Sequence, residues 1–373
     1  MKHRVKVLQR GQGMTDQRNW DMYDYILEAG EAVRNIVKDE DQILKEALDY
    51  SGTGDLDQIY IVGSGTSYHA GLAAKRVFEK ILKIRTDCEY ALEFVDNVEL
   101  FTRNALVIGI SQAGRSSSTI AALDKARMNH LKTIAITAEL DHPLKDHADV
   151  TIPLAIGPEY AGPKTKGFIG TIATLDLLAL NLAVRRKTIT ENEKQSFIAR
   201  MLATTDHIPD IADKASEWYK ANKKDLIQCR RMIVLGYGPN IGAMKEGTLK
   251  LFEAVRYSVT GYETEEFMHG GYHSVNDGTW IISLCFPDYH MERAVRMNEY
   301  FTQHRHAHCY CVSSQKINHS DFCYPFADDE LFAAMEYVVV LQVLARRMSQ
   351  DLGIDCNVSE DPDFHRFMGS YTY

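Results

Sequence analysis

Two turns rich in glycine and hydroxyl groups follow apolar stretches of the chain and have the composition of anion-binding loops. The first lies in IYIVGSGTSYH at residues 59–69, and the second, SQAGRSSST at 111–119, follows ALVIGI. A strand that ends in such a turn and continues into a helix offers backbone N–H groups and a positive dipole end to an anion. Neither turn has the Gly-Lys-Ser/Thr ending of a nucleotide-hydrolysing loop. Glycine at a tight turn also has a purely steric explanation, but the hydroxyls of the second turn favour a phosphate on a small molecule.

Candidate acid–base residues lie on a largely apolar helical stretch in the second half of the chain. Glu246, Lys250 and Glu253 recur at i, i+4 and i+7, which places them on one helical face. A solvated, salt-bridged stripe is the alternative, but the apolar neighbours favour side chains that point into a site. A carboxylate held beside a lysine and partly desolvated can serve as a general base. His269 follows in a glycine-flanked loop; it could transfer protons at neutral pH or be an ordinary surface histidine.

The elements that must position these residues recur in the same order in each half of the chain. Apolar strands that alternate with amphipathic helices predict parallel sheets covered by helices on both faces. We expect an N-terminal helical segment at 1–50, a first domain at 51–186, a helical connector at 187–228, a second domain at 229–350 and a tail at 351–373. The predicted strands are 58–63, 88–94, 105–110, 132–137 and 149–154 in the first half and 232–236, 279–285 and 309–312 in the second, where 260–268 is predicted to be a loop.

Charge and composition narrow the possible partners. A formal net charge of −9 argues against nucleic acid or an anionic membrane as a partner. No apolar stretch approaches the roughly 18 residues of a membrane span, and the N-terminus has no signal-peptide pattern. Seven scattered cysteines are typical of a reducing cytoplasm. The alternating His and Cys residues at 304–311 do not converge as metal ligands would, so we expect no metal site.

Four motifs together resemble the sugar isomerase (SIS) superfamily: IVGSGTSYHAG, ISQAGRSSST, GPEYAGPKTKGF and EGTLKLFEAVRYSVTGYETEEFMHGG. The likeness covers roughly residues 17–350 and is greatest to the isomerase domain of glucosamine-6-phosphate synthase and to the Amadori-sugar phosphate deglycases. It implies an α/β fold of two flavodoxin-like SIS domains, each a five-stranded parallel sheet with helices on both faces. It also implies a homodimer with its sites at the subunit interface, where the partner contributes the histidine.

The resemblance assigns roles to particular positions of this sequence. Glu253 and His269, sixteen residues apart, match the catalytic pair, and Glu246 and Lys250 match positions that line the sugar site. The expected phosphosugar-binding residues are Ser67, Ser111, Gln112, Ser116 and Thr119.

Departures from the synthase favour a deglycase. The synthase's glutaminase cysteine has no counterpart before Cys88, its serine and glutamate in the second loop are replaced by Ala113 and Arg115, and residues 361–373 lack its tail lysine. We therefore expect an enzyme that cleaves a 6-phosphorylated sugar–amino-acid adduct to hexose 6-phosphate and amino acid, without metal or organic cofactor. The aromatic tail would then suit the aminoacyl part of the adduct. An aldose–ketose or aminosugar-phosphate isomerase and a non-catalytic sugar-phosphate sensor are the alternatives.

Overall fold

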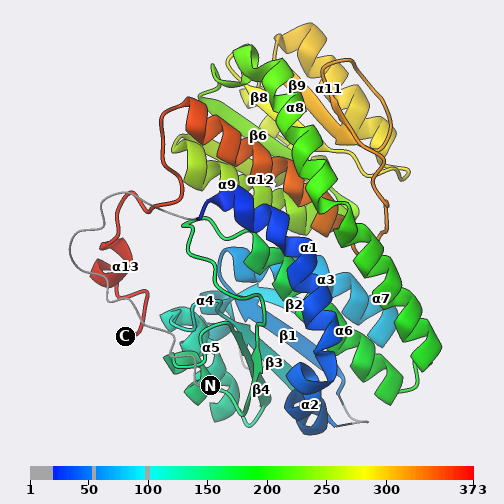
Figure 1. Ribbon diagram of the computed structural model, residues 1–373, viewed down its shortest axis with the longest axis vertical. Helices are drawn as coiled ribbons and strands as arrows, with labels where there is room; N and C mark the ends of the chain where they lie inside the picture. Colours follow the sequence, from blue (N-terminus) through cyan, green and yellow to red (C-terminus); the bar gives the residue numbers. More distant parts are fainter. Residues whose placement is uncertain (1–19, 53–55, 97–100) are drawn as a thin grey trace, which may run out of the picture.

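The computed structural model describes residues 20–52, 56–96 and 101–373, which form two parallel β-sheets with helices packed around and between them (Figure 1). The predicted N-terminal segment 1–50 therefore lies outside the described residues as far as residue 19. Its remainder forms α1 (Met22–Lys38) and α2 (Glu40–Ser51). In Figure 1, α1 runs alongside helices of both halves, and its contacts with α6 and α12 agree with that view.

The first sheet has five parallel strands in the order β2-β1-β3-β4-β5. The side chains of β1 alternate: Ile59 and Ile61 pack with α3 and α6, while Tyr60 and Val62 pack with α4 and α5 on the other face. Both faces are covered, which explains the continuous apolar strands. The strands are β1 (Gln58–Gly63), β2 (Arg85–Tyr90), β3 (Ala105–Ile110), β4 (Lys132–Thr137) and β5 (Val150–Pro153), and the helices are α3 (Thr66–Val77), α4 (Ala91–Asp96), α5 (Ser117–Met128) and α6 (Lys166–Arg185).

The second sheet repeats this topology, in the order β10-β9-β8-β6-β7 with all neighbours parallel. In each sheet the first strand lies between the second and the third, so the predicted fold class is confirmed. The strands are β6 (Arg231–Gly236), β7 (Ser258–Glu263), β8 (Trp280–Leu284), β9 (His308–Ser313) and β10 (Phe322–Cys323), and the helices are α9 (Ile241–Val255), α10 (Thr264–Phe267), α11 (Met291–Arg305) and α12 (Ala333–Asp351).

Two helices, α7 (Glu191–Asp206) and α8 (Ile208–Leu226), lie within residues 187–228, where the helical connector is predicted, and α13 (Phe364–Phe367) lies in the C-terminal tail. The exact domain boundaries stay a prediction, because buried side chains of both halves belong to one continuous cluster.

Sequence prediction was wrong at two edge strands, β2 and β7, and did not include the two-residue edge strand β10. The predicted strand 88–94 begins earlier, as β2, and its second part is α4; the predicted loop 260–268 contains β7 and α10. Both β2 and β7 lie at sheet edges and are only partly buried, so their sequences alternate polar and small residues rather than forming an apolar stretch. The apolar criterion that finds central strands does not find such edges.

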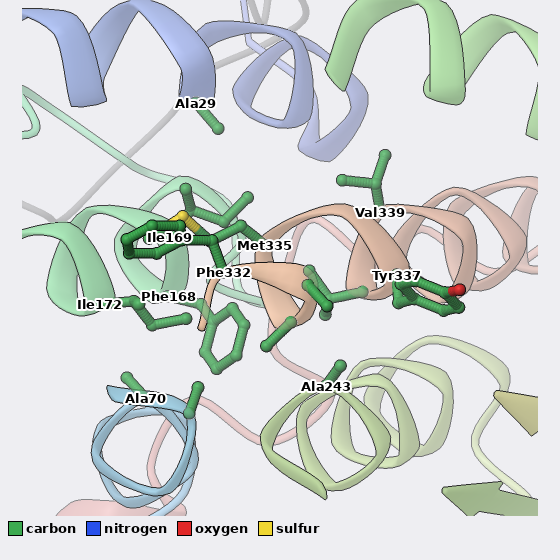
Figure 2. Close-up of a cluster of buried hydrophobic side chains, with 14 of the residues drawn as sticks. Ala29, Ala70, Phe168, Ile169, Ile172, Ala243, Phe332, Met335, Tyr337 and Val339 are labelled. Carbon is green, nitrogen blue, oxygen red and sulfur yellow. The ribbon is translucent and has the colours of Figure 1, made fainter. Parts of the chain in front are cut away.

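The two halves pack against each other through α3, α6, α9 and α12. Figure 2 shows Ala70, Phe168, Ala243 and Met335, one from each of these helices, pointing into a shared apolar cluster. Among the described residues, α6 alone has the length and composition of a membrane span, and 89% of its apolar window is buried inside the protein. The expectation that no apolar stretch approaches the length of a membrane span was therefore wrong for α6, whose burial shows that its apolar surface is used for packing.

The contact between α9 and α12 requires glycine at position 247. A Cβ there would lie 2.0 Å from Leu341 Cδ1 and 2.7 Å from Leu341 Cβ. We expect Gly247→Ala to lower the free energy of unfolding by roughly 1–3 kcal/mol in urea denaturation, because the added methyl overpacks the interface. Helix propensity alone predicts the opposite sign, a gain of about 1 kcal/mol. An unchanged or raised stability would therefore contradict the packing explanation.

The double variant Gly247→Ala/Leu341→Ala is the control. Removal of the leucine side chain beyond Cβ relieves the closest of these contacts, so the double variant should lose less stability than the sum of the two single losses.

Candidate functional site

Residues 111–119, here called the hydroxyl loop, join the end of β3 to the start of α5. Ser116 caps α5: its Oγ accepts hydrogen bonds from the Thr119 N–H (3.4 Å) and the Thr119 Oγ1 hydroxyl (3.1 Å). The Ser116 N–H in turn donates to Ser111 Oγ at 3.4 Å. Three of the predicted phosphate-binding residues are thus brought together at the N-terminus of a helix, where the dipole favours an anion.

Gln112 points toward the N-terminus of α6 rather than into the hydroxyl cluster. Its Nε2 donates to Glu159 Oε2 at 2.9 Å. The same carboxylate accepts the backbone N–H groups of Thr165 (2.7 Å), Lys166 (3.0 Å) and Gly167 (3.0 Å). Glu159 therefore satisfies the first turn of α6 with a charge-assisted cap and holds Gln112 at the edge of the hydroxyl loop.

Ser67 lies in the first turn of α3, at the same edge of the sheet. A Cβ on Gly63, the last residue of β1, would lie 3.0 Å from Ser67 Cβ and 3.3 Å from the carbonyl oxygen of Ile110. Because β1 and β3 are neighbours, their carboxyl ends place Ser67 beside the start of the hydroxyl loop. This is the crevice where open α/β sheets bind ligands.

The same turn of α3 reaches α9 in the other half of the protein. Glu246 is fully buried and accepts hydrogen bonds from Thr66 Oγ1 (3.0 Å) and the His69 ring (2.8 Å), with Lys250 Nζ at 3.4 Å. The buried Lys250 ammonium also donates to Glu253 Oε2 at 2.8 Å. The Glu253 side chain is about one-third exposed, at 35%, so the row of charges runs from the core toward solvent.

The ionised forms of this row stabilise one another. Burial by itself raises the pKa of Glu246, but the Lys250 ammonium and the His69 hydrogen bond outweigh it, and the pKa lies below its ordinary value. Burial likewise lowers the pKa of Lys250, but Glu246 and Glu253 together raise it above its ordinary value. Glu253 is therefore a carboxylate anchored by a hydrogen bond to a buried ammonium.

His269 is not brought to this row within one chain. Its side chain is 69% exposed, and its nearest charged partner is Glu265, 3.9 Å away in the neighbouring turn. Among the contacts of the described residues, none joins His269 to Glu253. The two predicted catalytic residues therefore do not meet within one chain.

The end of the C-terminal tail pairs in antiparallel fashion with the hydroxyl loop. The Ser117 N–H donates to the Ser370 carbonyl oxygen (3.1 Å), and the Thr372 N–H donates to the Arg115 carbonyl oxygen (2.8 Å). Tyr371 is partly buried between them, and burial together with Tyr373 and Glu253 raises its pKa. The tail therefore contacts the loop of the first sheet while Tyr371 lies within electrostatic range of the acid–base helix.

Two cavities border these elements. One of about 230 Å³ is lined by His69 and by the outer face of α9, including Leu249 and the half-exposed Phe252. A larger groove of about 610 Å³ lies between α1 and the end of α12 around the Asp21–Arg346 ion pair, and it contains none of the predicted site residues. Within residues 20–52, 56–96 and 101–373, no three His, Cys, Asp or Glu side chains are grouped as metal ligands.

Sequence reasoning missed four residues that shape the site: Thr66, His69, Glu159 and Tyr371. Thr66 and His69 lie three residues apart at the start of a helix, a spacing that could have indicated a shared polar partner. The partner itself, 177 residues away from His69, is not indicated by any local pattern.

We expect Glu246→Gln to lower the free energy of unfolding by about 3 kcal/mol at pH 7, because it leaves the Lys250 charge buried with less compensation. The folded pKa of Glu246 lies below its ordinary value of 4.5, so its contribution is present above that pH and is lost as the pH falls through the folded pKa. Urea denaturation between pH 3 and 7 should therefore show the gap between wild type and variant closing toward acid.

Glu46→Gln, at an exposed position of α2, removes the same charge and is the control. Equal effects of the two substitutions would show that Glu246 has no special role in stability.

Comparison with known proteins supports the architecture. Residues 55–181 match the SIS domain family. A glutamine–fructose-6-phosphate aminotransferase (isomerizing) of Clostridium tetani is 29% identical over 329 residues, which cover 86% of this chain and 53% of the relative. The chain spans about half the length of the curated relatives it matches.

Two solved structures cover nearly the whole fold. A Clostridium difficile protein described as a candidate phosphosugar isomerase has a TM-score of 0.89 at 26% identity, covering 95% of this chain and 99% of that one. A Salmonella typhimurium protein described as a candidate sugar-binding protein has a TM-score of 0.73 at 29% identity, with 87% and 97% covered. Together with the two repeated parallel sheets, these matches support the assignment of the chain to the sugar isomerase (SIS) superfamily.

Proposed function

We propose that this protein is a deglycase, which hydrolyses a 6-phosphorylated sugar–amino-acid adduct to hexose 6-phosphate and free amino acid. The observation that carries the proposal is the charged row on α9, in which Glu253 is anchored 2.8 Å from a buried ammonium. Tyr371, which pairs with the hydroxyl loop, lies within electrostatic range of Glu253. A carboxylate so placed can take a proton from carbon, while the hydroxyl loop holds the phosphate.

The phosphate end of the proposal rests on the hydroxyl loop and the first turn of α3. Ser111, Ser116 and Thr119 form one hydrogen-bonded cluster, and Ser67 lies at the same sheet edge. Hydroxyls and backbone N–H groups at a helix N-terminus suit phosphate oxygens. Gln112, held by Glu159, borders the cluster and can contact the sugar hydroxyls.

The proposed reaction moves one proton and adds one water. In the open-chain adduct, Glu253 removes a proton from C1, and the C2 carbonyl accepts the electron pair as an enol. Return of a proton to C2 gives a C1=N imine, which water hydrolyses to an aldehyde and the free amine. Atoms balance as adduct plus water giving hexose 6-phosphate plus amino acid. The roles of His269 are to open the sugar ring or to protonate an oxygen.

An aldose–ketose or aminosugar-phosphate isomerase is the second candidate. The same proton transfer between C1 and C2 serves both reactions, and one solved relative is described as a candidate phosphosugar isomerase. Release of free amino acid from a glycated substrate distinguishes the deglycase from it.

We also propose a homodimer in which the partner subunit supplies His269 to the site. In the monomer the histidine is exposed and meets only its own loop, as far as the described residues show. The outer face of α9 presents Phe252 at 52% exposure, and Tyr262 of the neighbouring β7 is 41% exposed. Apolar side chains so close to the acid–base row suit burial against a second copy of the chain.

We expect Glu253→Gln to reduce turnover of a phosphorylated adduct by roughly 10²–10⁴-fold, because a general base is lost. The affinity for hexose 6-phosphate should stay within about twofold, since the hydroxyl loop is unchanged. Turnover is measured as amino-acid release and affinity by calorimetry.

Glu46→Gln serves again as the matched control and should keep full activity. Full activity of Glu253→Gln would mean that another group is the base.

The shared-site hypothesis predicts complementation between inactive variants. Glu253→Gln and His269→Asn should each be nearly inactive, yet refolded equimolar mixtures should recover about a quarter of wild-type activity. Half of the dimers in such a mixture are mixed, and each of these contains one site with both wild-type residues. If both residues act within one chain, mixing will restore nothing.

A further inference from the structure

Arg115 is the only cation in the hydroxyl loop. Its guanidinium contacts the His142 ring, with Nη2 2.7 Å from Nε2, and lies 5.3 Å from the centre of the Tyr373 ring. Among the described residues, no carboxylate forms an ion pair with it. In a chain with a formal net charge of −9, a cation without a carboxylate partner at a helix N-terminus attracts an anion.

The loop backbone and His142 hold Arg115 in place. The His142 ring is 2.6 Å from the Ala113 carbonyl oxygen, so Nδ1–H donates to the loop itself and Nε2 is left to accept from the guanidinium. Gly114 adopts a φ of +64°, and a Cβ there would lie 2.9 Å from both His142 Cβ and Thr137 Oγ1. The turn is therefore closely packed against the end of β4, and the arginine is positioned in advance of any ligand.

Another cation near the loop, Lys166, is already paired with other groups. Lys166, at the start of α6, forms an ion pair with Glu28 and donates to the Pro158 carbonyl oxygen. The Glu159 carboxylate also borders the loop and would repel an anion. Serine hydroxyls and a helix dipole supply only partial charges, so a phosphate dianion in this loop needs Arg115.

We infer that Arg115 is a further phosphate-binding residue and that the tail residue Tyr373 holds its guanidinium over the hydroxyl loop. The inference rests on the proposed binding of a phosphosugar but not on the proposed reaction. It gives the tail a role beside the one expected for the aminoacyl part of a substrate, because the tail strand is paired with the hydroxyl loop.

Phosphate is favoured over a substrate carboxylate by position. Arg115 directly precedes Ser116, which caps α5 and bonds to both Ser111 and Thr119. A guanidinium in this place can donate two parallel hydrogen bonds to phosphate oxygens held by the same loop.

The test measures the affinity of the full chain for glucose 6-phosphate by calorimetry, with glucose and inorganic phosphate as further probes. Arg115→Met should weaken binding of glucose 6-phosphate by roughly ten- to hundredfold, the range of a charge-assisted hydrogen bond. Arg115→Lys should lose less affinity than Arg115→Met because it keeps the charge, but it should not reach the wild-type affinity because it lacks the paired donors. Added salt should weaken binding to the wild type more than binding to the Met variant.

Arg127→Met removes an equal charge from α5, the helix that follows the loop, at an exposed position near Asp149, and should leave the affinity unchanged. Tyr373→Ala should weaken the binding of glucose 6-phosphate about two- to fivefold, the range of a partly exposed cation–π contact. Phe367→Ala, in the same tail at 89% exposure, is its control. Neither tail substitution touches the core, so these variants remain informative if Arg115→Met does not fold.

Unchanged glucose 6-phosphate affinity in Arg115→Met would overturn the inference. If such a variant instead lost affinity only for a sugar–amino-acid adduct, Arg115 would belong to the aminoacyl carboxylate. All binding measurements can be repeated with Glu253→Gln, so loss of the deglycase proposal would leave this test intact.

Discussion

The arrangement of the site depends on the buried ammonium of Lys250. Removal of such a charge from water costs several kcal/mol, and the cost is offset here by two carboxylates on the same helix. One of them, Glu246, is itself buried and is satisfied only because Thr66 and His69 reach it from α3. A charge on the second half of the chain therefore requires the first half to be docked. The charges around the candidate base are therefore stabilised only when the two halves of the chain are packed together.

This coupling explains why the helices between the sheets contain so many small residues. Gly242 and Gly247 let α9 approach α3 and α12 so closely that a Cβ at either position would collide with the neighbouring helix. Close approach is what brings the first turn of α3 within hydrogen-bonding distance of Glu246. The apolar cluster in Figure 2 and the polar row beside it thus depend on the same helix spacing.

The C-terminal tail also connects α9, which contains the charged row, with the hydroxyl loop. Arg256, at the left-handed end of α9, forms an ion pair with Glu360 and donates to the Val358 carbonyl oxygen. The chain then continues to the hydroxyl loop, where its last residues pair with the segment before α5. A ligand in that loop and a ligand group near Glu253 would both meet the tail. The tail thereby contacts both α9 of the second half and the hydroxyl loop of the first.

Much of this molecule follows from sequence alone. Central strands such as β1 and β3 are buried on both faces, so their continuous apolar residues identify them, and their glycine- and serine-rich ends indicate the anion loop. The i, i+4, i+7 spacing of Glu246, Lys250 and Glu253 is local and equally readable. Edge strands β2 and β7 were not predicted correctly, because they are only partly buried and their sequences therefore lack a continuous apolar stretch.

Only the tertiary structure decided which polar groups meet. The contact between His69 and Glu246 and the pairing of residue 371 with residue 116 join positions far apart in the chain. Helix and strand periodicity reports which face of an element is buried, but not which distant element covers it. Hydrogen-bond partners over such separations are selected by how whole helices pack, and that selection is a property of the folded chain.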